Sequence, residues 1–527
     1  QLFGGKIIPN RGIWLEFETD SDGFIAVKID RHRKVAVTSL LRVFGMSDEE
    51  MIKTFGEAIK VTLKEDDAKT VPESYLEIYK RIRPGDLATA DDAKRLIDTM
   101  FQDTSRYDLS GVGRFKLNQR LEMNGSESKV LEARDLAEII KEIIRLNIDP
   151  RAQADDIDHL SNRRVRAVGE LLQSRLRVGF ARLRRNVQDK MSTIEDELLN
   201  PITLVNPRLL TSVVQEFFSS SSVSQFMDQI NPLSEVEHKR RLTALGPGGL
   251  TKERASIEVR DVHESYYGKI CPIQSPEGSN IGLVSSFANY AKLNEYGFIV
   301  TPYVEVKKSK LTGKIFWLDA AEEEKYKIAA SNTEFDKYGN ITEKQVDARI
   351  KGKPGICESS EVSFIDISPN QLFSVATSLV PFLEHDDANR ALMASNMQRQ
   401  AVPSIKPEAP YVGTGVEDAV AKDSGYMIFS DVTGVVSELD GNHITIKPAE
   451  GKPVIYELTK FKMVNGSMAV TQKPLIKKGD KVSKGDALAD GHAMNQGTLS
   501  LGQNLVVAFV SFGGLNFEDA IILSERV

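Results

Sequence analysis

Regular structure has to stop at residues 246–249, where three glycines and one proline occupy four consecutive positions. Glycine and proline both disfavour continuation of a helix or a strand. Backbone N–H groups in such a loop can approach a phosphate group or another backbone segment closely. A basic cluster at residues 238–241, of sequence His-Lys-Arg-Arg, precedes the loop. This combination is typical of a nucleic-acid contact, and it is equally typical of a solvated helix end followed by a surface turn.

The composition is that of a globular protein with several domains. The 527 residues are enough for about three to five domains. A hydrophobic content of 41% and a charged content of 27% are ordinary for soluble proteins, and no apolar run is long enough to span a membrane. The N-terminal residues lack the apolar core of a signal peptide, and the two cysteines, Cys271 and Cys357, exclude a disulfide framework and an all-cysteine zinc site. We therefore expect a cytoplasmic protein.

Charge is distributed unevenly along the chain. The net charge of −7 excludes a protein that is basic overall, but it leaves room for a local surface that binds phosphate groups. Basic clusters occur at residues 31–34, 163–185 and 238–241, whereas acidic clusters occur at 65–67 and 322–324. Such segregation suits a large assembly with one lined channel, and it also suits an ordinary acidic protein.

The N-terminal part of the chain predicts a mixed α+β domain followed by a long helix. Residues 13–17 and 24–29 predict a β-hairpin around a turn at 20–23. Residues 162–190 predict an amphipathic helix whose arginines would repel one another unless anions or acidic side chains lie nearby. An earlier helix is indicated by Leu136, Ile140, Ile143 and Ile144 at helical spacing. The apolar stripe of the long helix is Val165, Val168, Leu172, Leu176, Phe180, Leu183 and Val187, and its arginines are Arg163, Arg164, Arg166, Arg175, Arg177, Arg182, Arg184 and Arg185.

A β-rich module is expected at residues 295–366. Strands are predicted at 298–306, 314–318 and 362–367, with a turn at 311–313. Two helices should follow. Cap and proline signals predict the first from 368 to 380, and an aspartate at 386 or 387 starts the second, which ends before the proline at 403.

The C-terminal part of the chain predicts short strands and turns. A repeated Lys-Gly-Asp at 478–480 and 484–486 indicates two turns, and residues 505–510 and 520–523 predict buried strands. The expected fold class is therefore mixed α+β and multidomain.

Two groups of side chains could carry chemistry. Glu518 and Asp519 lie between predicted apolar strands, where they must face water or meet a cation, and Mg²⁺ prefers carboxylate oxygen. From the residues alone, a solvated turn is the favoured explanation of this pair. Arg390, with Met393, Asn396 and Gln400, falls on one drifting helical face; its guanidinium suits a triphosphate, and the two amides suit ribose or phosphate. The alternative is a basic helix face paired with acids.

Residues 384–387, of sequence Glu-His-Asp-Asp, do not predict a metal site. Four consecutive residues on a regular helix or strand cannot all point at one ion, so helix capping is the preferred interpretation.

Four long stretches, in order, resemble the beta subunit of bacterial DNA-directed RNA polymerase: residues 224–251, 271–283, 384–403 and 513–527. Residues 106–118 carry a further mark of the same family. The resemblance implies a lobe, protrusion helices, a fork, a β-rich external domain and a partial double-psi β-barrel with a barrel-sandwich hairpin. The implied boundaries are 1–160 for the lobe, 161–222 for the C-terminal portion of the protrusion, 223–294 for the fork and rifamycin-pocket region, 295–366 for the external domain, and 367–527 for the hybrid-binding region with the partial barrel.

The resemblance also implies an activity, partners and a cofactor. The expected reaction is template-dependent RNA synthesis from nucleoside triphosphates, by an assembly of beta, beta-prime, alpha and omega subunits with a sigma factor on a DNA template. Mg²⁺ would be held mainly by aspartates of beta-prime. The chain resembles an internal portion of the family's beta subunit, so we expect it to be inactive alone.

Family roles fall on specific positions of this sequence. The implied catalytic residues are Arg390, Glu518 and Asp519, with the two acids in possible outer-shell contact with Mg²⁺, and the implied substrate- and RNA-binding residues are Asn396, Arg399 and Gln400. Thr243 stands where the family usually has serine, so its extra methyl group puts rifamycin sensitivity in doubt. The rifamycin-pocket positions are Gln225, Phe226, Asp228, His238, Arg241, Thr243, Leu245, Pro276, Asn280 and Val284.

Two other functions remain compatible with the residues. One is a non-catalytic module that binds nucleic acid or antibiotic. The other is a magnesium-dependent phosphohydrolase, disfavoured because no carboxylate pair recurs at a ligand-like spacing. It would use Glu384, Asp386, Asp387, Glu518 and Asp519.

Overall fold

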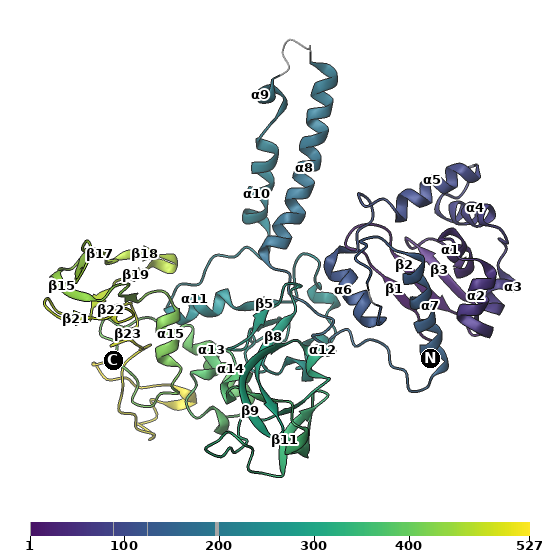
Figure 1. Ribbon diagram of the computed structural model, residues 1–527. Helices are drawn as coiled ribbons and strands as arrows, with labels where there is room; N and C mark the ends of the chain where they lie inside the picture. The colour runs from purple at the N-terminus through teal and green to yellow at the C-terminus, as the bar shows by residue number, and fades with distance from the viewer. Residues whose placement is uncertain (1, 88, 124, 195–199) are drawn as a thin grey trace. The chain divides into compact units, whose positions relative to one another are not determined.

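The computed structural model describes residues 2–87, 89–123, 125–194 and 200–527, which fall into two compact units (Figure 1). The first unit is Gln1–Ile157 and the second is Asp158–Val527. Each contains helices, strands and hydrophobic cores of its own, which confirms the predicted mixed α+β, multidomain class. Within the described ranges, no helix is both long enough and apolar enough to cross a membrane.

An antiparallel sheet in the order β1-β2-β3-β4 lies in the first unit. β2 and β3 form the predicted hairpin, and its turn closes through a hydrogen bond from the Asp20 N–H to the Phe24 carbonyl (2.9 Å). Leu15 and Phe17 alternate along β2 and are buried, as expected for a strand with one face on the core. The strands are β1 Gly5–Ile7, β2 Leu15–Thr19, β3 Ile25–Ile29 and β4 Val35–Ala36.

Helices complete the core of the first unit. Leu136, Ile140 and Ile143 are buried on one face of α7, which confirms the helical spacing read from the sequence. Burying each such side chain contributes about 1.5–3 kcal/mol. The helices are α1 Val37–Val43, α2 Asp48–Phe55, η1 Gly56–Ile59, α3 Lys60–Glu65, α4 Val71–Ile82, α5 Ala90–Phe101, α6 Ser110–Arg120 and α7 Ala133–Ile148.

The second unit begins with a helical hairpin made by α8 (Val168–Thr193), α9 (Pro201–Leu204) and α10 (Arg208–Ser220). The prediction of one helix over 162–190 is wrong at its start, because the Val165 N–H donates to the Gly297 carbonyl (2.8 Å) instead of joining a helix. The remaining apolar stripe is only partly covered: Val168 and Phe180 stay exposed, and Leu172, Leu176, Leu183 and Val187 are half-buried.

Most of the β-rich module is one sheet in the order β12-β11-β10-β13-β8-β7, with β9 paired to β8. The predicted turn at 311–313 is wrong. The β8–β9 hairpin turns at Lys308 and Ser309, both with positive φ, and Gly313 lies at an irregularity inside β9 where the register shifts. The strands are β7 Lys292–Leu293, β8 Ile299–Lys307, β9 Lys310–Leu318, β10 Lys327–Ala329, β11 Gln345–Ile350, β12 Lys353–Glu358 and β13 Phe364–Asp366.

The two helices predicted after this sheet differ in outcome. Ser368 caps as expected, but the first helix splits into η7 (Pro369–Leu372) and α13 (Val375–Ser378), because Ser374 caps a new start. The second helix, α14 (Ala388–Gln398), begins after Asp387, whose side chain accepts a hydrogen bond from the Asn389 N–H (3.1 Å). The other short helices are α12 Ala320–Glu323 and α15 Glu417–Asp423.

Small antiparallel sheets follow, in the orders β17-β16-β15-β21 and β14-β22-β20. Both Lys-Gly-Asp repeats are turns, as predicted. In each, the aspartate side chain accepts a 2.7 Å hydrogen bond from the N–H three residues earlier, at Lys477 and Ser483. The strands are β14 Ile428–Phe429, β15 Gly434–Leu439, β16 His443–Pro448, β17 Val454–Glu457, β18 Lys462–Val464, β19 Met468–Val470, β20 Lys473–Pro474, β21 Lys481–Val482, β22 Ala487–Asp490, β23 Met494–Asn495 and β24 Thr498–Leu499.

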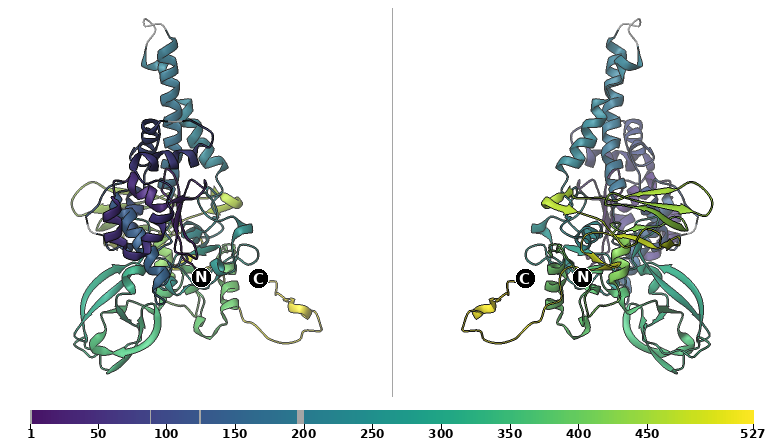
Figure 2. Two further views of the ribbon diagram at one scale, coloured as in Figure 1. Left: turned by 90° about the vertical axis from the view of Figure 1, so that its right-hand side faces the viewer. Right: turned by 90° about the vertical axis from the view of Figure 1, so that its left-hand side faces the viewer.

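The expected buried strands at 505–510 and 520–523 are not formed. This C-terminal segment, yellow in Figure 2, is an open loop with one short helical turn, η10 (Phe517–Asp519). Val506 and Phe509 are almost fully exposed, at 105% and 99%. A strand needs a partner for its N–H and C=O groups, and no described strand pairs with these residues.

Candidate nucleic-acid interface

Helix α11 (Pro232–Lys239) carries the first residues of the basic cluster, and side-chain capping fixes its start. The Asn231 side chain accepts a hydrogen bond from the Ser234 N–H (2.8 Å), and the Ser234 hydroxyl accepts one from the Asn231 N–H (3.1 Å). The same Asn231 amide donates to carbonyls near the end of α14, which ties the two helices together. These are the carbonyls of Gln398, Arg399 and Ala401, at 3.2, 3.3 and 2.9 Å.

His238 is held as a neutral imidazole between two predicted pocket residues. Its Nδ1 accepts a hydrogen bond from the Asp228 N–H (3.0 Å), so its Nε2 is left to donate to the Gln225 side-chain oxygen (3.2 Å). Burial, reinforced by the positive charges of Arg241 and Arg399, lowers the pKa of His238. Three of the predicted pocket positions are therefore connected through one ring.

Two guanidinium groups approach one another without an acid partner. Desolvation and the charge of Arg399 lower the pKa of Arg241. Arg399 donates to the Asn396 side-chain oxygen (2.7 Å), and its buried Nε has no partner. In the described part of the chain, neither arginine forms an ion pair. Guanidinium groups left in this state favour an incoming phosphate or carboxylate.

The glycine loop is held close to the strand pair that bears Arg241 and Thr243. β5 (Arg241–Thr243) pairs with β6 (Val284–Ser286), which places Thr243 opposite Val284. The Thr243 hydroxyl accepts a hydrogen bond from the Leu245 N–H (3.1 Å). A Cβ at Gly249 would lie 2.4 Å from the Ala244 carbonyl oxygen, so only glycine fits this loop as it is folded.

The remaining predicted pocket positions lie on neighbouring loops. Phe226 is 78% exposed and follows Gln225 directly. Pro276 and Asn280 lie in the loop before β6, which bends at Gly278 with a φ of +101°. The structure thus brings the pocket positions onto two adjoining segments, 225–245 and 276–284.

Helix α14 presents Arg390 to the surface and keeps Asn396 inside. Arg390 is exposed, and its guanidinium donates to the Met393 sulfur (3.6 Å) and to no other side chain among the described residues. Asn396 is buried; its amide donates to the Ser275 carbonyl (3.1 Å) while its oxygen accepts from Arg399. Gln400 is exposed just beyond the helix. The free groups on this face are therefore Arg390, part of Arg399 and Gln400, whereas Asn396 is occupied internally.

Glu237 joins four segments around this site, a role that no local sequence pattern indicates. Its carboxylate is buried and accepts hydrogen bonds from the Gln274 amide (2.9 Å), the Ser286 hydroxyl (2.8 Å) and the Ala376 N–H at the start of α13 (2.8 Å). Helical periodicity alone could not reveal this role, because residues 238–241 beside it suggest a solvated surface. Only the packing of α11 against three other segments shows that Glu237 points inward.

Glu518 and Asp519 are not brought to this site. Both are exposed in the C-terminal loop, and no hydrogen bond or ion pair between described residues joins either to Arg390, Arg399 or Gln400. Among the described residues, no group of three or more His, Cys, Asp or Glu side chains could hold a metal ion. Residues 384–387 follow the capping interpretation, since Asp387 is the N-cap of α14.

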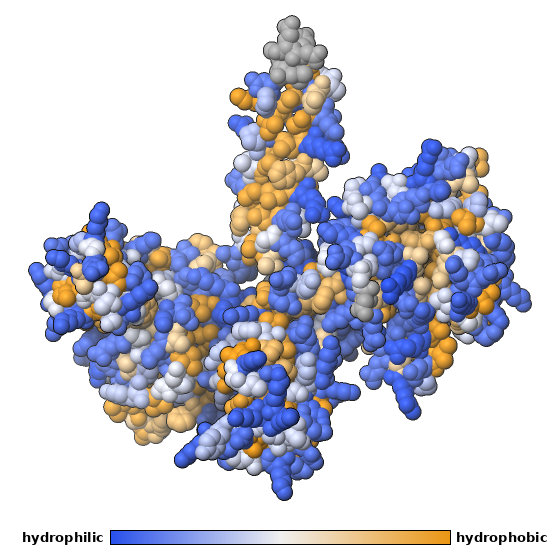
Figure 3. Space-filling model, in the orientation of Figure 1, coloured by the Kyte–Doolittle hydropathy of each residue, from blue (hydrophilic) through white to orange (hydrophobic). Residues whose placement is uncertain are grey.

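The helical hairpin adds a second basic surface in the same unit. Arg164 and Arg166 form ion pairs with Glu170, at 2.7 and 3.1 Å, so one carboxylate partly neutralises the start of the arginine-rich segment. The later arginines are exposed and form no ion pair with any described residue; Figure 3 shows hydrophilic patches beside the apolar face of the hairpin. They are Arg175, Arg177, Arg182, Arg184 and Arg185.

Comparison with protein families gives four matches along the chain. RNA polymerase Rpb2 domain 2 matches residues 2–166, and domain 3 matches 225–293. The external 1 domain of the RNA polymerase beta subunit matches 303–368, and Rpb2 domain 6 matches 429–527.

Curated relatives are similar over the whole of this chain. The DNA-directed RNA polymerase subunit beta of Gloeobacter violaceus is 47% identical over 530 residues, which cover 100% of this chain and 48% of the relative. The subunits of Corynebacterium glutamicum (strain R) and Syntrophomonas wolfei are each 46% identical, over 100% of this chain and 46% and 48% of their own lengths. The chain thus spans about half the length of the curated relatives it matches.

Proposed function

The chain belongs to the RNA polymerase beta subunit family, and from this premise we propose that it provides nucleotide, RNA and DNA contacts in a DNA-directed RNA polymerase. Within the proposal it is part of a beta subunit, assembled with beta-prime, alpha and omega subunits and a sigma factor in the bacterial cytoplasm. The assembly copies a DNA template into RNA from nucleoside triphosphates. The residue ranges inferred from the sequence for lobe, protrusion, fork, external domain and hybrid-binding region with partial barrel remain part of this proposal.

The observation that carries the proposal is the group of arginines without acid partners on α14 and β5. Arg399, at the end of α14, is half-buried and its charge acts on Arg241, which is exposed on β5; Arg390 is exposed on α14. Burying a cation without an acid partner is costly, so such an arrangement favours a ligand that brings negative charge. Phosphates of a nucleotide and of an RNA strand supply that charge in a planar form that guanidinium groups bind well.

The proposed chemistry divides the work between subunits. A ribose 3′ oxygen attacks the α-phosphorus of a nucleoside triphosphate and pyrophosphate leaves; when bound, two Mg²⁺ ions stabilise the entering and leaving oxygens. Beta-prime aspartates would hold these ions. Glu518 and Asp519, exposed side by side and without side-chain partners among the described residues, fit a water-mediated contact and not a complete ligand set.

Within this chain, binding and orientation are the proposed tasks. Arg390 binds the triphosphate, and Arg399 and Gln400 bind the RNA 3′ end. Asn396 acts through Arg399, because its oxygen accepts a hydrogen bond from that guanidinium. A nucleotide and an RNA 3′ end that are already held beside one another react faster, because less translational and rotational freedom has to be lost at the transition state.

The pocket around His238 is proposed to border the path of nascent RNA and to be the surface that rifamycins bind. The Thr243 hydroxyl oxygen already accepts a hydrogen bond from the Leu245 N–H (3.1 Å), and its methyl group adds bulk at an exposed position. We expect Thr243→Ser to make an assembled enzyme more sensitive to rifamycin. Equal inhibition of both enzymes in a rifamycin titration would contradict this.

A non-catalytic binding module is the second candidate, and the lack of a metal-holding group among the described residues favours it for the chain in isolation. On this reading the purified chain binds nucleic acid or a rifamycin and synthesises no RNA. A phosphohydrolase is disfavoured for the same reason. Magnesium-dependent hydrolysis of a simple phosphate ester by the purified chain would revive that third possibility.

Charge reversal at Arg390 tests the proposed function. Arg390→Glu, introduced into the beta subunit of an assembled polymerase, should abolish nucleotide addition while leaving assembly intact. The side chain is exposed, and among the described residues its guanidinium hydrogen-bonds to Met393 alone. Lys337→Glu, an exposed charge reversal in the β-rich module, is the matched control. Unchanged elongation by the Arg390 variant would refute the nucleotide role.

A further inference from the structure

A cationic cavity of about 570 Å³ lies in the first unit, and none of its lining residues belongs to the sites proposed above. Two elements form it: the turn between β3 and β4, and the end of α4 with the residues that follow. The turn is fixed by a hydrogen bond from the His32 N–H to the Ile29 carbonyl (3.0 Å). The lining residues are Arg31, His32, Arg33, Glu77, Lys80, Arg81 and Pro84.

The lining carries more positive charge than it neutralises. Four cations and one carboxylate leave a net charge of +3 when His32 is neutral. Glu77 is used by Arg81, whose guanidinium pairs with it at 2.7 Å. Among the described residues, Arg33 and Lys80 form no ion pair. Like charges that lie close together repel one another, so a bound anion would reduce this electrostatic repulsion.

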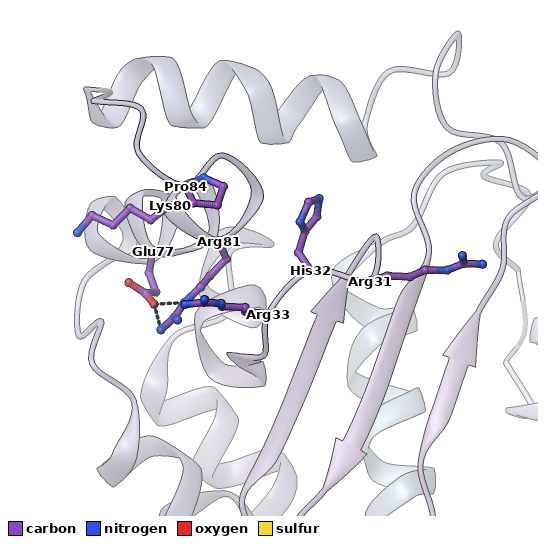
Figure 4. A pocket seen from close by; sticks show the side chains of 7 residues that line it. All are labelled: Arg31, His32, Arg33, Glu77, Lys80, Arg81 and Pro84. Atoms are coloured by element: carbon purple, nitrogen blue, oxygen red, sulfur yellow. Dashed lines mark hydrogen bonds and ion pairs between the residues drawn. The ribbon is translucent and has the colours of Figure 1, made fainter.

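Figure 4 shows how these side chains lie. Arg33 from the turn and Arg81 from α4 extend to the same place beside Glu77, while His32 stands apart and Lys80 reaches outward from the helix. Arg31 points the other way, and its guanidinium lies 4.6 Å from the centre of the Trp14 ring. Arg33 and the unpaired edge of Arg81 therefore face a ligand in the cavity, and Lys80 is an exposed, flexible cation on its lining.

We propose that this cavity binds a compact anion with two or three linked phosphate groups. Guanidinium groups match the geometry of phosphate oxygens, and a lysine adds a mobile point charge. The volume lies in the range of small-molecule sites. Arg33 and Arg81 reach the same place from two elements, and Lys80 lines the same cavity, which favours a compact ligand over the extended backbone of a nucleic acid.

Calorimetric titration of the full 527-residue chain with inorganic tripolyphosphate tests the proposal. Arg33→Glu combined with Lys80→Glu should weaken binding by on the order of tenfold or more, because both charges are reversed at the ligand. The matched control is Lys53→Glu combined with Lys129→Glu, two exposed lysines of the same unit outside the cavity. The control should bind as the unaltered chain does. Failure of the unaltered chain to bind, or an equal loss in the control, would overturn the proposal.

Two further measurements separate the effect of charge from loss of folding and distinguish a compact anion from a nucleic acid. Arg33→Gln combined with Lys80→Gln removes the charges without reversing them and should give a smaller loss in the same direction; thermal unfolding checks that every variant is folded. A single-stranded oligonucleotide is titrated in parallel. If only oligonucleotide binding responds to the cavity variants and tripolyphosphate does not bind, the ligand is a nucleic-acid backbone and the compact ligand is refuted.

Discussion

At Glu237, a single buried carboxylate accepts hydrogen bonds from three segments that surround the candidate site. Glu237→Gln replaces one acceptor oxygen by an NH₂ group that faces donors. Leaving a buried polar group unsatisfied costs about 1–3 kcal/mol, so we expect the free energy of unfolding of the second unit to fall by that amount. Urea denaturation measures it.

Glu277 provides the control for this substitution, because it is exposed in the turn before β6. Glu277→Gln should change the stability by less than about 0.5 kcal/mol. An equally small change in stability for Glu237→Gln would show that the buried carboxylate does not stabilise the fold as its hydrogen bonds suggest.

The neutral state of His238 gives a pH dependence with a definite sign. Burial and two nearby arginines lower the pKa of His238, so the folded chain binds the proton less well than the unfolded chain. The stabilisation is complete above the ordinary histidine pKa of about 6.5 and is lost as the pH falls from there through the lowered folded value. NMR titration of the imidazole should report a pKa below that of a free histidine, and a higher value would contradict the assigned hydrogen bonds.

Helix-capping residues could be predicted from the sequence, whereas buried polar residues that hydrogen-bond to distant segments could not. Asp387 and Ser368 were identified because a cap depends on its own short segment. Glu237 and Asn396 depend on partners more than 35 residues away, such as Gln274 and Ser275, which no local pattern reveals. The pocket positions implied by the family resemblance stay a prediction, and the sequence did not indicate that Asn396 is occupied internally.

At the scale of elements, we expect the arginines of α8 to bind nucleic acid through the negative charge of its phosphate groups. Arg182→Glu combined with Arg185→Glu removes two exposed cations that form no ion pair with described residues. We expect weaker binding of single-stranded nucleic acid by the 527-residue chain, with a salt dependence shallower by about one to two ions released. Fluorescence anisotropy at several salt concentrations measures both quantities.

Lys337→Glu combined with Lys344→Glu reverses two exposed charges in the β-rich module and serves as the control. Equal loss of affinity in both double variants would mean that net charge, and not the surface of α8, determines binding.

Element prediction failed where pairing partners decide the structure. The apolar runs at 505–510 and 520–523 have the composition of strands, yet they are exposed because no described strand offers them a hydrogen-bonding edge. In the β8–β9 hairpin, Gly313 suggested the turn, but the register placed the turn at Lys308 and Ser309. Local signals identified the β8–β9 hairpin but misplaced its turn, and long-range pairing decides whether an apolar run becomes a strand at all.

At the scale of the whole molecule, we propose that the chain provides a binding surface within a larger assembly. It spans about half the length of its curated relatives, and no metal-holding group occurs among the described residues. The site residues that the structure does bring together come from α11, β5, β6 and α14. The proposed binding role has to be tested in the assembled enzyme, where template, transcript and the other subunits are present.

Photocrosslinking from the 3′ end of nascent RNA is the most direct measurement. A photoreactive nucleotide is placed at that end in a stalled, assembled polymerase, and the crosslinked residues of this chain are mapped. We predict crosslinks at residues 388–400, beside Arg390, Arg399 and Gln400. Crosslinks confined to the β-rich module at 295–366, with none near α14, would contradict the proposed role of this site.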